Sequence, residues 1–386
     1  MSRVSPFVGL LYDQARSGSL DLVSTPPYDV ISPEDQRRYL AASPYNVIRL
    51  VLGEDRPGDE EIDGKYRRAA ELLRAWREEQ VLVPTGGPAY FGYEMRFVFR
   101  GRPRRTRGLI CLVDLEDWGG SILPHERTME APVEERLRLM RAVRANLSCI
   151  HAVFRGPCEP LAQALSPPLN DLAHTIDEAG VEHRMWPVPP ETDVAGWLAQ
   201  ESMMIADGHH RYTMALRYRD EMRALHGPGP WDQVMMLLVD ASVEEPPVLP
   251  YHRLLISGDP PSRGERVRDL AEVLQSVSDD DLVYGTVARE GGELVHRVAH
   301  LEGEPPTVCA LHGQVLAASD DELRFTPDAI EAEDAVRHDR AVAAYVLPAT
   351  NASRIRSVID GGQRLPQKST FFWPKPRSGM IIRPLG

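Results

Sequence analysis

The stretch that most constrains the fold is Met203–Tyr212, which reads MMIADGHHRY. It opens with a short apolar run of strand type and passes through Asp207 and Gly208, a common turn dipeptide. A helical pattern follows, whose apolar face contains Ala215, Tyr218, Met222 and Leu225. We therefore predict a buried strand, a tight turn and a helix, with polar groups gathered at the junction.

The composition of this turn suits an anionic ligand, most plausibly a phosphate. A helix that begins here directs unpaired backbone N–H groups and the positive end of its dipole at the turn. Gly208 lets an anion approach the backbone, and Arg211 offers a planar charged fork. The adjacent His209 and His210 could instead belong to a solvated helix cap. Five such residues directly behind a buried strand favour the phosphate site.

Length and charge narrow the class of protein. A chain of 386 residues predicts two domains or one elaborated domain, and 42% hydrophobic content allows a sizeable core. The net charge of −13 argues against a general binder of nucleic acid or anionic membranes. No apolar run approaches the roughly 18 residues of a membrane span, and no apolar signal region opens the chain. The cysteines have no CxxC spacing, which argues against a disulfide framework or a zinc ribbon: Cys111, Cys149, Cys158 and Cys309. We expect a reducing cytoplasm.

Two charged residues stand out in the first segment of the chain. Asp29 lies in the turn-like stretch Pro26–Ile31, and Arg49 lies in Asn46–Gly53, which we predict to be a strand. Each charge sits in an otherwise apolar or turn context. Either residue could be solvated or paired, and either could belong to a functional site.

Two further stretches carry candidate site residues. His125 and Glu126 lie in a loop before a predicted helix, a good place for a general base or a metal-bound water. Glu126 could also simply cap that helix or pair with Arg127. In the tail, Lys368 and Ser369 are donors suited to phosphate, beside an aromatic run that anchors the chain end. The sequence contains no Walker loop, and no GxGxxG follows a strand.

Several motifs in order resemble the domain-of-unknown-function family 1015 along almost the whole chain. They are PPYDVIS at Pro26–Ser32, PYNVIRL at Pro44–Leu50, PHERT at Pro124–Thr128, ADGHHRYTMAL at Ala206–Leu216, LPYHRLL at Leu249–Leu255 and LPQKSTFFWPKPRSGMII at Leu365–Ile382. The resemblance identifies the family and implies no established activity.

The turn itself resembles the ParB/sulfiredoxin-like superfamily, which includes ParB CTPases, sulfiredoxins and free-serine kinases. That superfamily places a G-x-[HR]-R turn at a helix start to hold nucleotide phosphates, and Gly208, His210 and Arg211 fit it. Asp207-Gly208-His209 is similar to the serine-kinase version. The reactive cysteine of sulfiredoxin is absent from this turn, which argues against a redox role.

These observations predict an α/β to α+β protein with a mixed-sheet, ParB/sulfiredoxin-like core. We assign residues 1–245 to this core and its site, 246–364 to a mainly structural α+β domain, and 365–386 to a tail returning to the core. The predicted activity is nucleotide-dependent phosphoryl transfer to a small hydroxylated metabolite, with free serine as one candidate. This chemistry needs mainly positioning and charge stabilisation.

The predicted roles follow from this activity. The phosphate-binding residues are Gly208, His209, His210, Arg211, Lys368, Ser369 and Arg49. Asp207 or Glu126 would coordinate Mg²⁺, carried with ATP, ADP or CTP. Glu126 or Asp29 would accept the substrate hydroxyl proton, with His125 beside them as a further catalytic candidate. We expect Asp29, Arg49, Glu126, Asp207–Arg211 and Lys368 to line one pocket.

Two alternatives belong to other classes. A metal-dependent hydrolase would use side chains that ligate metals or act as bases: His125, Glu126, Asp207, His209 and His252. A ParB-like, nucleotide-gated regulator would bind without catalysis, but the acidic charge and the lack of a helix-turn-helix signal argue against it. The partners expected are a nucleotide and a small molecule, with neither nucleic acid nor membrane, and the oligomeric state is left open.

Overall fold

The computed structural model describes residues 4–59, 63–156, 159–168, 171–198, 201–259, 261–316 and 322–385, so Cys158 lies outside the described residues. The chain divides into two compact units. Unit 1 comprises Met1–Pro124, Thr128–Pro246 and Pro374–Gly386, and unit 2 comprises His125–Arg127 and Pro247–Trp373. The predicted tail is thus shared, with its last part in unit 1 and its first part in unit 2.

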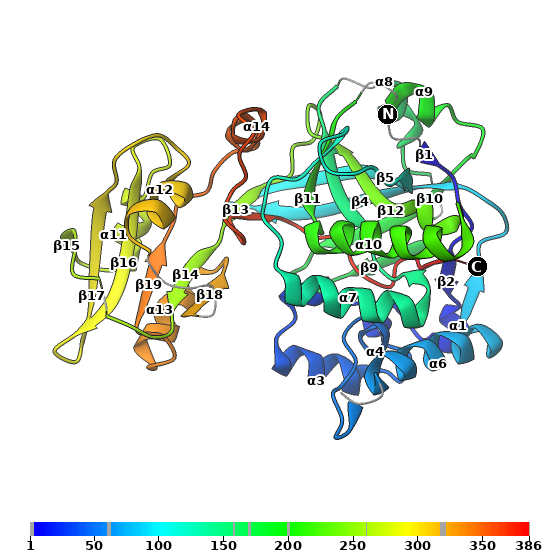
Figure 1. The fold of residues 1–386 in the computed structure, drawn as a ribbon, viewed down its shortest axis with the longest axis horizontal. Helices are drawn as coiled ribbons and strands as arrows, with labels where there is room; N and C mark the ends of the chain where they lie inside the picture. Colours follow the sequence, from blue (N-terminus) through cyan, green and yellow to red (C-terminus); the bar gives the residue numbers. More distant parts are fainter. Residues whose placement is uncertain are drawn as a thin grey trace. The chain divides into compact units, whose positions relative to one another are not determined.

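Unit 1 is built on a nine-stranded mixed sheet (Figure 1). Its strands run in the order β6 (Ile122–Leu123), β11 (Met203–Asp207), β8 (Ile150–Phe154), β12 (Gln233–Asp240), β5 (Arg102–Asp114), β4 (Tyr90–Phe99), β10 (Glu182–Val188) and β9 (Ala173–Ile176), with β1 (Val4–Ser5) beside β5. The pairs β11–β6 and β12–β8 are parallel, whereas β11–β8 and β12–β5 are antiparallel. The mixed-sheet α+β class predicted from the sequence is therefore confirmed.

The sequence explains the centre of this sheet. Val234–Val239 is a continuous apolar run, and every residue in it is buried, as expected of a strand covered on both faces. β4 and β5 form a hairpin in which Phe99 pairs with Arg102. The two residues between them, Arg100 and Gly101, both have positive φ, 50° and 74°, as a tight two-residue hairpin turn requires.

Some helices of unit 1 pack on this sheet, and others pack on those helices. The helices of this unit are α1 (Gln14–Ser17), α2 (Leu20–Val23), η1 (Tyr28–Val30), α3 (Pro33–Ala42), α4 (Ile48–Val51), α6 (Gly64–Glu78), α7 (Glu130–Val143), α8 (Glu159–Ala164), α9 (Val194–Leu198), α10 (His209–His226) and η2 (Pro230–Asp232). Two short ladders complete the unit, β2 (Leu10–Tyr12) with β3 (Leu82–Pro84) and β7 (Ala145–Asn146) with β21 (Arg383–Pro384).

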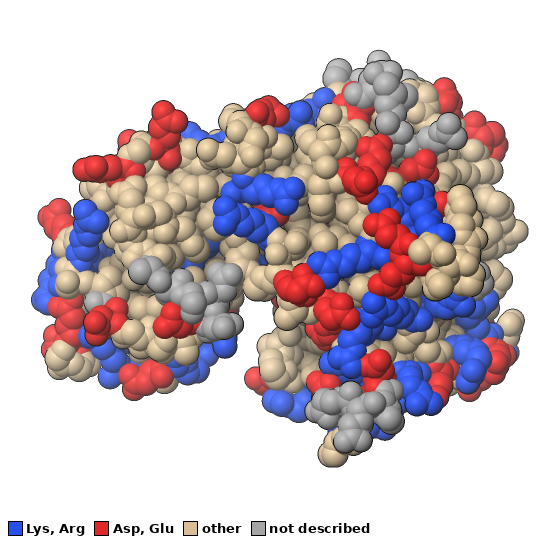
Figure 2. Space-filling model, viewed as in Figure 1, with Lys and Arg blue, Asp and Glu red and all other residues tan. Residues whose placement is uncertain are grey.

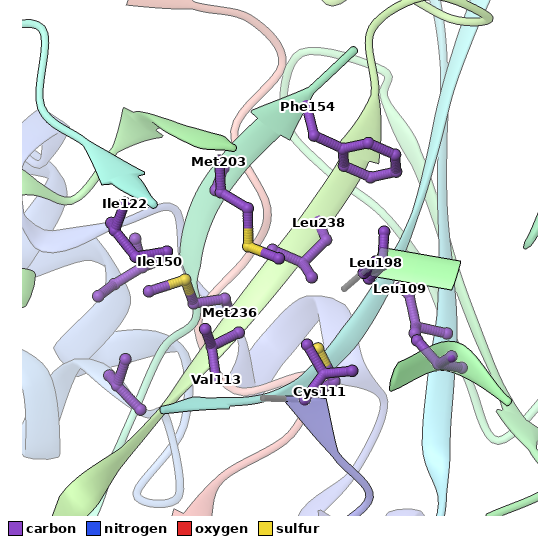
Figure 3. Close-up of a cluster of buried hydrophobic side chains, with 14 of the residues drawn as sticks. Leu109, Cys111, Val113, Ile122, Ile150, Phe154, Leu198, Met203, Met236 and Leu238 are labelled. Atoms are coloured by element: carbon purple, nitrogen blue, oxygen red, sulfur yellow. The ribbon is translucent and has the colours of Figure 1, made fainter. Parts of the chain in front are cut away.

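The main core of unit 1 lies against one face of the sheet. Figure 3 shows side chains of neighbouring strands, among them Cys111, Ile150, Met203, Met236 and Leu238, pointing into one apolar cluster. Residues of α8, α9 and α10 complete that cluster. A second cluster joins α7 to α10, which run side by side (Figure 1). The helix that follows the Gly208 turn is thus held between two apolar layers.

The predicted strand at Asn46–Gly53 is wrong, because this segment forms the short helix α4. The Asn46 side chain accepts a hydrogen bond from the backbone N–H of Ile48 at 2.9 Å, which is a local helix-start contact. Ile48, Leu50 and Val51 are all buried, so the helix is covered on most of its sides, with Arg49 as its polar residue. A short apolar run of this kind has no periodicity that separates a buried helix from a buried strand.

Unit 2 has its own antiparallel sheet and core. The six strands run in the order β15 (Glu265–Val267), β17 (Glu293–His300), β16 (Val283–Glu290), β19 (Ala343–Val346), β14 (His252–Leu255) and β18 (Leu323–Thr326). The helices are α11 (Leu270–Ser276), α12 (Thr307–Gln314), α13 (Ala329–Arg337) and α14 (Ala352–Asp360). A separate ladder joins β13 (Val248–Pro250) to β20 (Thr370–Phe372). Residues of α11 and α13 form an apolar core with this sheet.

Two surface properties bear on the class of partner. On the face drawn in Figure 2, acidic and basic side chains are interspersed and do not separate into large patches of one sign. Within the described ranges, no helix is both long and apolar enough to span a membrane.

Candidate functional site

The Gly208 turn connects β11 directly to α10. Gly208 has φ 104° and ψ 27°, a left-handed conformation that residues with a side chain rarely adopt. Its carbonyl oxygen accepts a hydrogen bond from the Tyr212 N–H at 2.9 Å, so the helix begins immediately after the glycine. A Cβ atom at this position would lie 3.1 Å from the Arg211 guanidinium. The predicted strand, turn and helix are confirmed, and only glycine fits the turn without strain.

Arg211 is buried beneath the turn and fixed at both ends of its guanidinium. Nη1 donates to Ser148 Oγ at 3.0 Å and to the carbonyl oxygen of Cys149, and Nη2 pairs with Asp207 Oδ2. Burial by itself would lower the pKa of Arg211, but the charges of Asp207 and Asp29 outweigh it and raise that pKa above its ordinary value. Arg211 is therefore a permanent, rigidly oriented positive charge at the start of α10.

Lys375 adds a second buried cation that the sequence analysis did not select. Its ammonium lies 2.5 Å from Asp207 Oδ1 and 2.9 Å from Asp29 Oδ2, so it bridges the two carboxylates. The Lys375 side chain is 6% exposed and that of Asp29 is 22% exposed. We call Asp29, Asp207, Arg211 and Lys375 the charge cluster. Two cations and two carboxylates balance formally, which makes a group of partly buried charges tolerable.

The two histidines of the turn differ in their surroundings. His209 is buried at the first position of α10, whereas His210 is half-buried. Nε2 of His210 accepts a hydrogen bond from the backbone N–H of Met129 at 3.1 Å, just before α7 begins. An imidazole nitrogen that accepts cannot carry a proton, so this contact favours neutral His210 protonated at Nδ1.

Glu126 lies in unit 2, where backbone N–H groups of the tail surround its carboxylate. Oε1 accepts from the N–H groups of Ser369 and Thr370 at 3.0 and 2.9 Å and from Thr370 Oγ1 at 2.8 Å. Oε2 accepts from the N–H of Lys368 at 3.1 Å. Lys368 has φ 50°, which turns three successive N–H groups toward one anion. The segment with Lys368 and Ser369, predicted to donate to phosphate, thus donates through its backbone to an internal carboxylate.

The neighbours of Glu126 are anchored in the same way. His125 is buried, its Nε2 lies 2.6 Å from Thr370 Oγ1, and its ring packs edge-on against Phe372. The Ser369 hydroxyl donates to the Pro366 carbonyl at 2.6 Å, and the Lys368 ammonium lies 5.3 Å from the centre of the Tyr251 ring. These contacts hold the tail segment onto the loop that carries Glu126.

Arg49 and His252 each satisfy a nearby backbone group. The Arg49 guanidinium donates to the carbonyl oxygens of Leu40 and Ser43, at 2.5 and 3.4 Å, at the end of α3. His252 Nδ1 accepts from the Leu347 N–H at 3.1 Å, and burial lowers the pKa of this histidine to about 4. Both residues thus have a structural partner within their own unit.

A match to a protein-family model shows which family the chain belongs to. Residues 4–325 match the family model described as "Protein of unknown function (DUF1015)". The chain belongs to the DUF1015 family. The resemblance that the motifs carry in the sequence is therefore confirmed. No functionally curated protein matches the chain significantly.

Solved structures similar to this DUF1015 protein are distant. A free serine kinase in complex with AMP matches with a TM-score of 0.38 and 12% identity, covering 68% of this chain and 86% of that chain. A conserved hypothetical protein from Pyrococcus furiosus matches with 0.37 and 12%, covering 69% and 93%. SbnI with a C-terminal truncation, from Staphylococcus aureus, matches with 0.35 and 12%, covering 72% and 87%. At these TM-scores the likenesses carry no functional argument.

The structure of this DUF1015 protein places the site residues of the sequence analysis in two groups. Unit 1 holds Asp29, Asp207 and Arg211 within one charge cluster, with His209 and His210 on the same turn. Unit 2 holds His125, Glu126, Lys368 and Ser369 as one hydrogen-bonded group. Arg49 belongs to unit 1 but binds the end of α3. A single pocket lined by all of them stays a prediction.

A buried histidine, His151 of β8, lies beside the charge cluster and was not selected from the sequence. It pairs in register with Asp207 on the neighbouring strand. The pKa of His151 is lowered to about 4, and burial is the largest cause. The nearby charges act in opposing directions, since Asp207 raises this pKa whereas Arg211 and Lys375 lower it. His151 is thus neutral near pH 7, and it contributes no charge to the cluster.

We expect His151 to limit stability in acid. Its folded pKa of about 4 lies below its ordinary value of 6.5, so protons bind preferentially to the unfolded chain. The contribution of neutral His151 to the free energy of unfolding is complete above about pH 6.5. It is lost progressively as the pH falls from 6.5 through 4. The loss is on the order of 3 kcal/mol, at 1.36 kcal/mol per pKa unit. Urea unfolding of wild type and His151→Leu from pH 7 to 4 measures it.

The variant should lose less stability between pH 6.5 and 4 than wild type does. His174→Leu is the control substitution, because the His174 side chain is 49% exposed. Parallel pH dependences of wild type and His151→Leu would contradict the assignment of this acid loss to His151.

Proposed function

We propose that the Gly208 turn and the charge cluster bind nucleotide phosphates, and that the protein transfers a phosphoryl group to a small hydroxylated metabolite. The observation that carries this proposal is the convergence of Arg211 and Lys375 at the N-terminus of the 18-residue helix α10. A helix N-terminus attracts anions through its dipole, and the two cations would add to that attraction where a phosphate takes the place of a carboxylate. Gly208 has no side chain to keep a phosphate away from the backbone.

In this proposal the residues divide the work. Arg211 is held by Ser148 and Cys149 and presents a fixed planar donor. Lys375 carries a compact charge on a flexible stem, so its ammonium can exchange a carboxylate for a phosphate oxygen. That exchange would release Asp29, the more exposed of the two carboxylates, to accept the proton of a substrate hydroxyl. His209 and His210 would line the phosphate from the first turn of α10.

Magnesium would be held through Asp207. Mg²⁺ is typically bound by one or two carboxylates together with substrate phosphates and water, and it would neutralise charge on the phosphates. The oxygen chemistry of Asp207 fits this role, with Asp29 beside it across Lys375. Glu126, the other predicted ligand, accepts backbone hydrogen bonds on both of its oxygens. Both oxygens of Asp207 are also paired, with Lys375 and Arg211, but the ammonium of Lys375 is on a flexible stem and could leave Oδ1 to Mg²⁺. We therefore favour Asp207 as ligand and Asp29 as base.

The two alternative functions gain less support. The hydrolase requires a cluster of metal ligands, and no group of three or more His, Cys, Asp or Glu side chains suited to a metal occurs among the described residues. A nucleotide-binding regulator without catalysis would use the same turn. Phosphoryl transfer in an assay with ATP and hydroxylated metabolites distinguishes it from the kinase.

Replacing Arg211 with Lys should weaken nucleotide binding at least tenfold. The substitution keeps the charge but loses the planar fork, and a charge-assisted hydrogen bond contributes about 1.5–3 kcal/mol. Calorimetric titration with Mg-ADP, Mg-ATP and Mg-CTP measures the affinity. Arg219→Lys is the matched control, because Arg219 is also buried in α10 but pairs with Asp117 and the Leu115 carbonyl. Equal affinities of Arg211→Lys and wild type, with both folded, would remove Arg211 from the phosphate site.

A further inference from the structure

A cavity of about 50 Å³ lies within unit 1 and is lined by residues of α7, α10 and the sheet strands β8 and β12. Its wall is mostly apolar and includes Val51, Leu139, Met140, Val143, Met214 and Val234. A single buried water requires roughly 10–15 Å³ on this scale, so the cavity has room for a molecule of a few non-hydrogen atoms. The cavity is therefore large enough for a small ligand, and its polar lining residues indicate the chemical class of that ligand.

Arg136, on α7, lines this cavity and has one buried nitrogen without a hydrogen-bond partner among the described residues. Its residue is 5% exposed, with Nη1 donating to the Val51 carbonyl at 2.6 Å and Nη2 to Glu135 at 2.9 Å. The Tyr28 ring covers one face of the guanidinium, 4.1 Å from its central carbon. The remaining donor, Nε, is buried and has no hydrogen-bond partner among the described residues. A buried donor without an acceptor is unfavourable, so a ligand that accepts from Nε gains stability there.

Ser378 brings a second open polar atom. Its residue is 1% exposed, and its backbone N–H donates to the Thr25 carbonyl at 2.8 Å. Ser378 lines the cavity, and its buried Oγ has no hydrogen-bond partner in the described part of the chain. Because Arg136 and Ser378 are far apart in the sequence, only the fold brings both residues to the wall of this cavity.

The charge of the lining defines the ligand class. Arg136 and Arg211 are the charged residues among the described residues that line the cavity, and no acidic side chain lines it. An amine would find no carboxylate to pair with, whereas a carboxylate would meet guanidinium donors. We propose that this cavity binds a short aliphatic monocarboxylate, whose carboxylate faces Arg136 and Ser378 and whose hydrocarbon part packs against Met140, Val143 and Met214.

This ligand class restricts which acceptor substrates the proposed phosphoryl transfer can use. The cavity shares Arg211 with the charge cluster, and Tyr28 directly precedes Asp29. A hydroxylated carboxylic acid without an amine is therefore a better acceptor than a free amino acid such as serine. The role as acceptor rests on the proposed function, whereas the binding of a monocarboxylate does not.

Three probes of equal chain length test the proposal: butyrate, 1-butanol and n-butylamine. We expect a ligand-observed NMR titration of the full chain to show saturable binding of butyrate, at least tenfold weaker binding of butanol and none of butylamine. Butylamine binding as tightly as butyrate would overturn the proposal. Equal weak signals from all three probes would also overturn it, because a cavity filled only by water has no preference for a carboxylate.

Two variants locate the binding. Ser378→Ala removes an unpartnered hydroxyl, so the protein should remain at least as stable while butyrate binds about fivefold more weakly. Met140→Phe fills the cavity and should weaken butyrate binding at least tenfold. Met222→Phe is the matched control, since Met222 belongs to the same α7–α10 cluster but does not line the cavity. Unchanged butyrate affinity in both Ser378→Ala and Met140→Phe would overturn the proposal.

The titrations also separate this proposal from the proposed function. If butyrate binds as expected while no nucleotide binds, the proposal of phosphoryl transfer is contradicted and the proposal of a carboxylate site is supported. If nucleotide binds to wild type but not to Arg211→Lys, and butyrate binds to neither, the phosphate site is supported and the carboxylate site is contradicted.

Discussion

Replacing Glu126 with Ala is expected to lower the free energy of unfolding by about 4 kcal/mol. The carboxylate accepts from the N–H groups of Lys368, Ser369 and Thr370 and from the Thr370 hydroxyl. Its removal leaves several donors without an acceptor, and loss of one partner from a buried charged interaction typically costs 3–5 kcal/mol. Urea unfolding, followed by circular dichroism, measures the change.

Asp360→Ala provides the control for this variant. Asp360 also belongs to unit 2, but its side chain is 59% exposed and pairs with Arg356 on the surface of α14. Such surface pairs contribute about 0–1 kcal/mol. Glu126→Gln, which keeps one acceptor oxygen, should fall between the two. If Glu126→Ala unfolds no more easily than Asp360→Ala, the hydrogen bonds to the tail contribute little to stability.

Replacing Asp29 with Asn is expected to lower the rate of phosphoryl transfer by about 10²–10⁴-fold, the usual contribution of a general base. This expectation rests on the proposed function. The amide keeps the shape of the carboxylate, and Lys375 keeps its contact with Asp207, so nucleotide affinity should change only a few-fold. Steady-state kinetics with ATP and a hydroxylated acceptor, together with calorimetry, measure both quantities.

Asp220→Asn is the control for the Asp29 variant, because Asp220 is a 64% exposed carboxylate outside the charge cluster. It should leave both rate and affinity unchanged. A loss of nucleotide affinity in Asp29→Asn equal to the loss of rate would indicate that Asp29 binds the metal or orders Lys375. No change in either quantity would exclude Asp29 as the base.

Local signals explain what the sequence could predict. The strand, turn and helix around Gly208 were predictable because an apolar run, a turn dipeptide and a helical period follow one another within about 20 residues. The mixed α+β class followed from several such segments. At Asn46–Gly53 the same reasoning gave a strand where α4 forms, because an apolar run that short has no distinguishing period and tertiary burial decides its conformation.

Long-range pairing explains what the sequence could not predict. Lys375 lies between two prolines in an aromatic stretch, and nothing nearby indicates that it binds Asp29, which lies 346 residues earlier in the chain. His151 was not predicted as a site residue, because a single histidine in an apolar strand has the pattern of an ordinary core residue. For Lys368 and Ser369, the sequence indicated donors for an anion, but it did not show that the anion they bind is the side chain of Glu126.

The path of the chain has a consequence for biosynthesis. The chain leaves unit 1 after Pro124 and after Pro246, and it returns for the last time at Pro374. Lys375, Ser378 and the strand β21 therefore emerge from the ribosome only after the residues of unit 2, although they belong to unit 1. Until then Asp29 and Asp207 lack the lysine that bridges them. A chain interrupted before Lys375 would leave these carboxylates without that cation, so the charge cluster can form only after unit 2 has been translated.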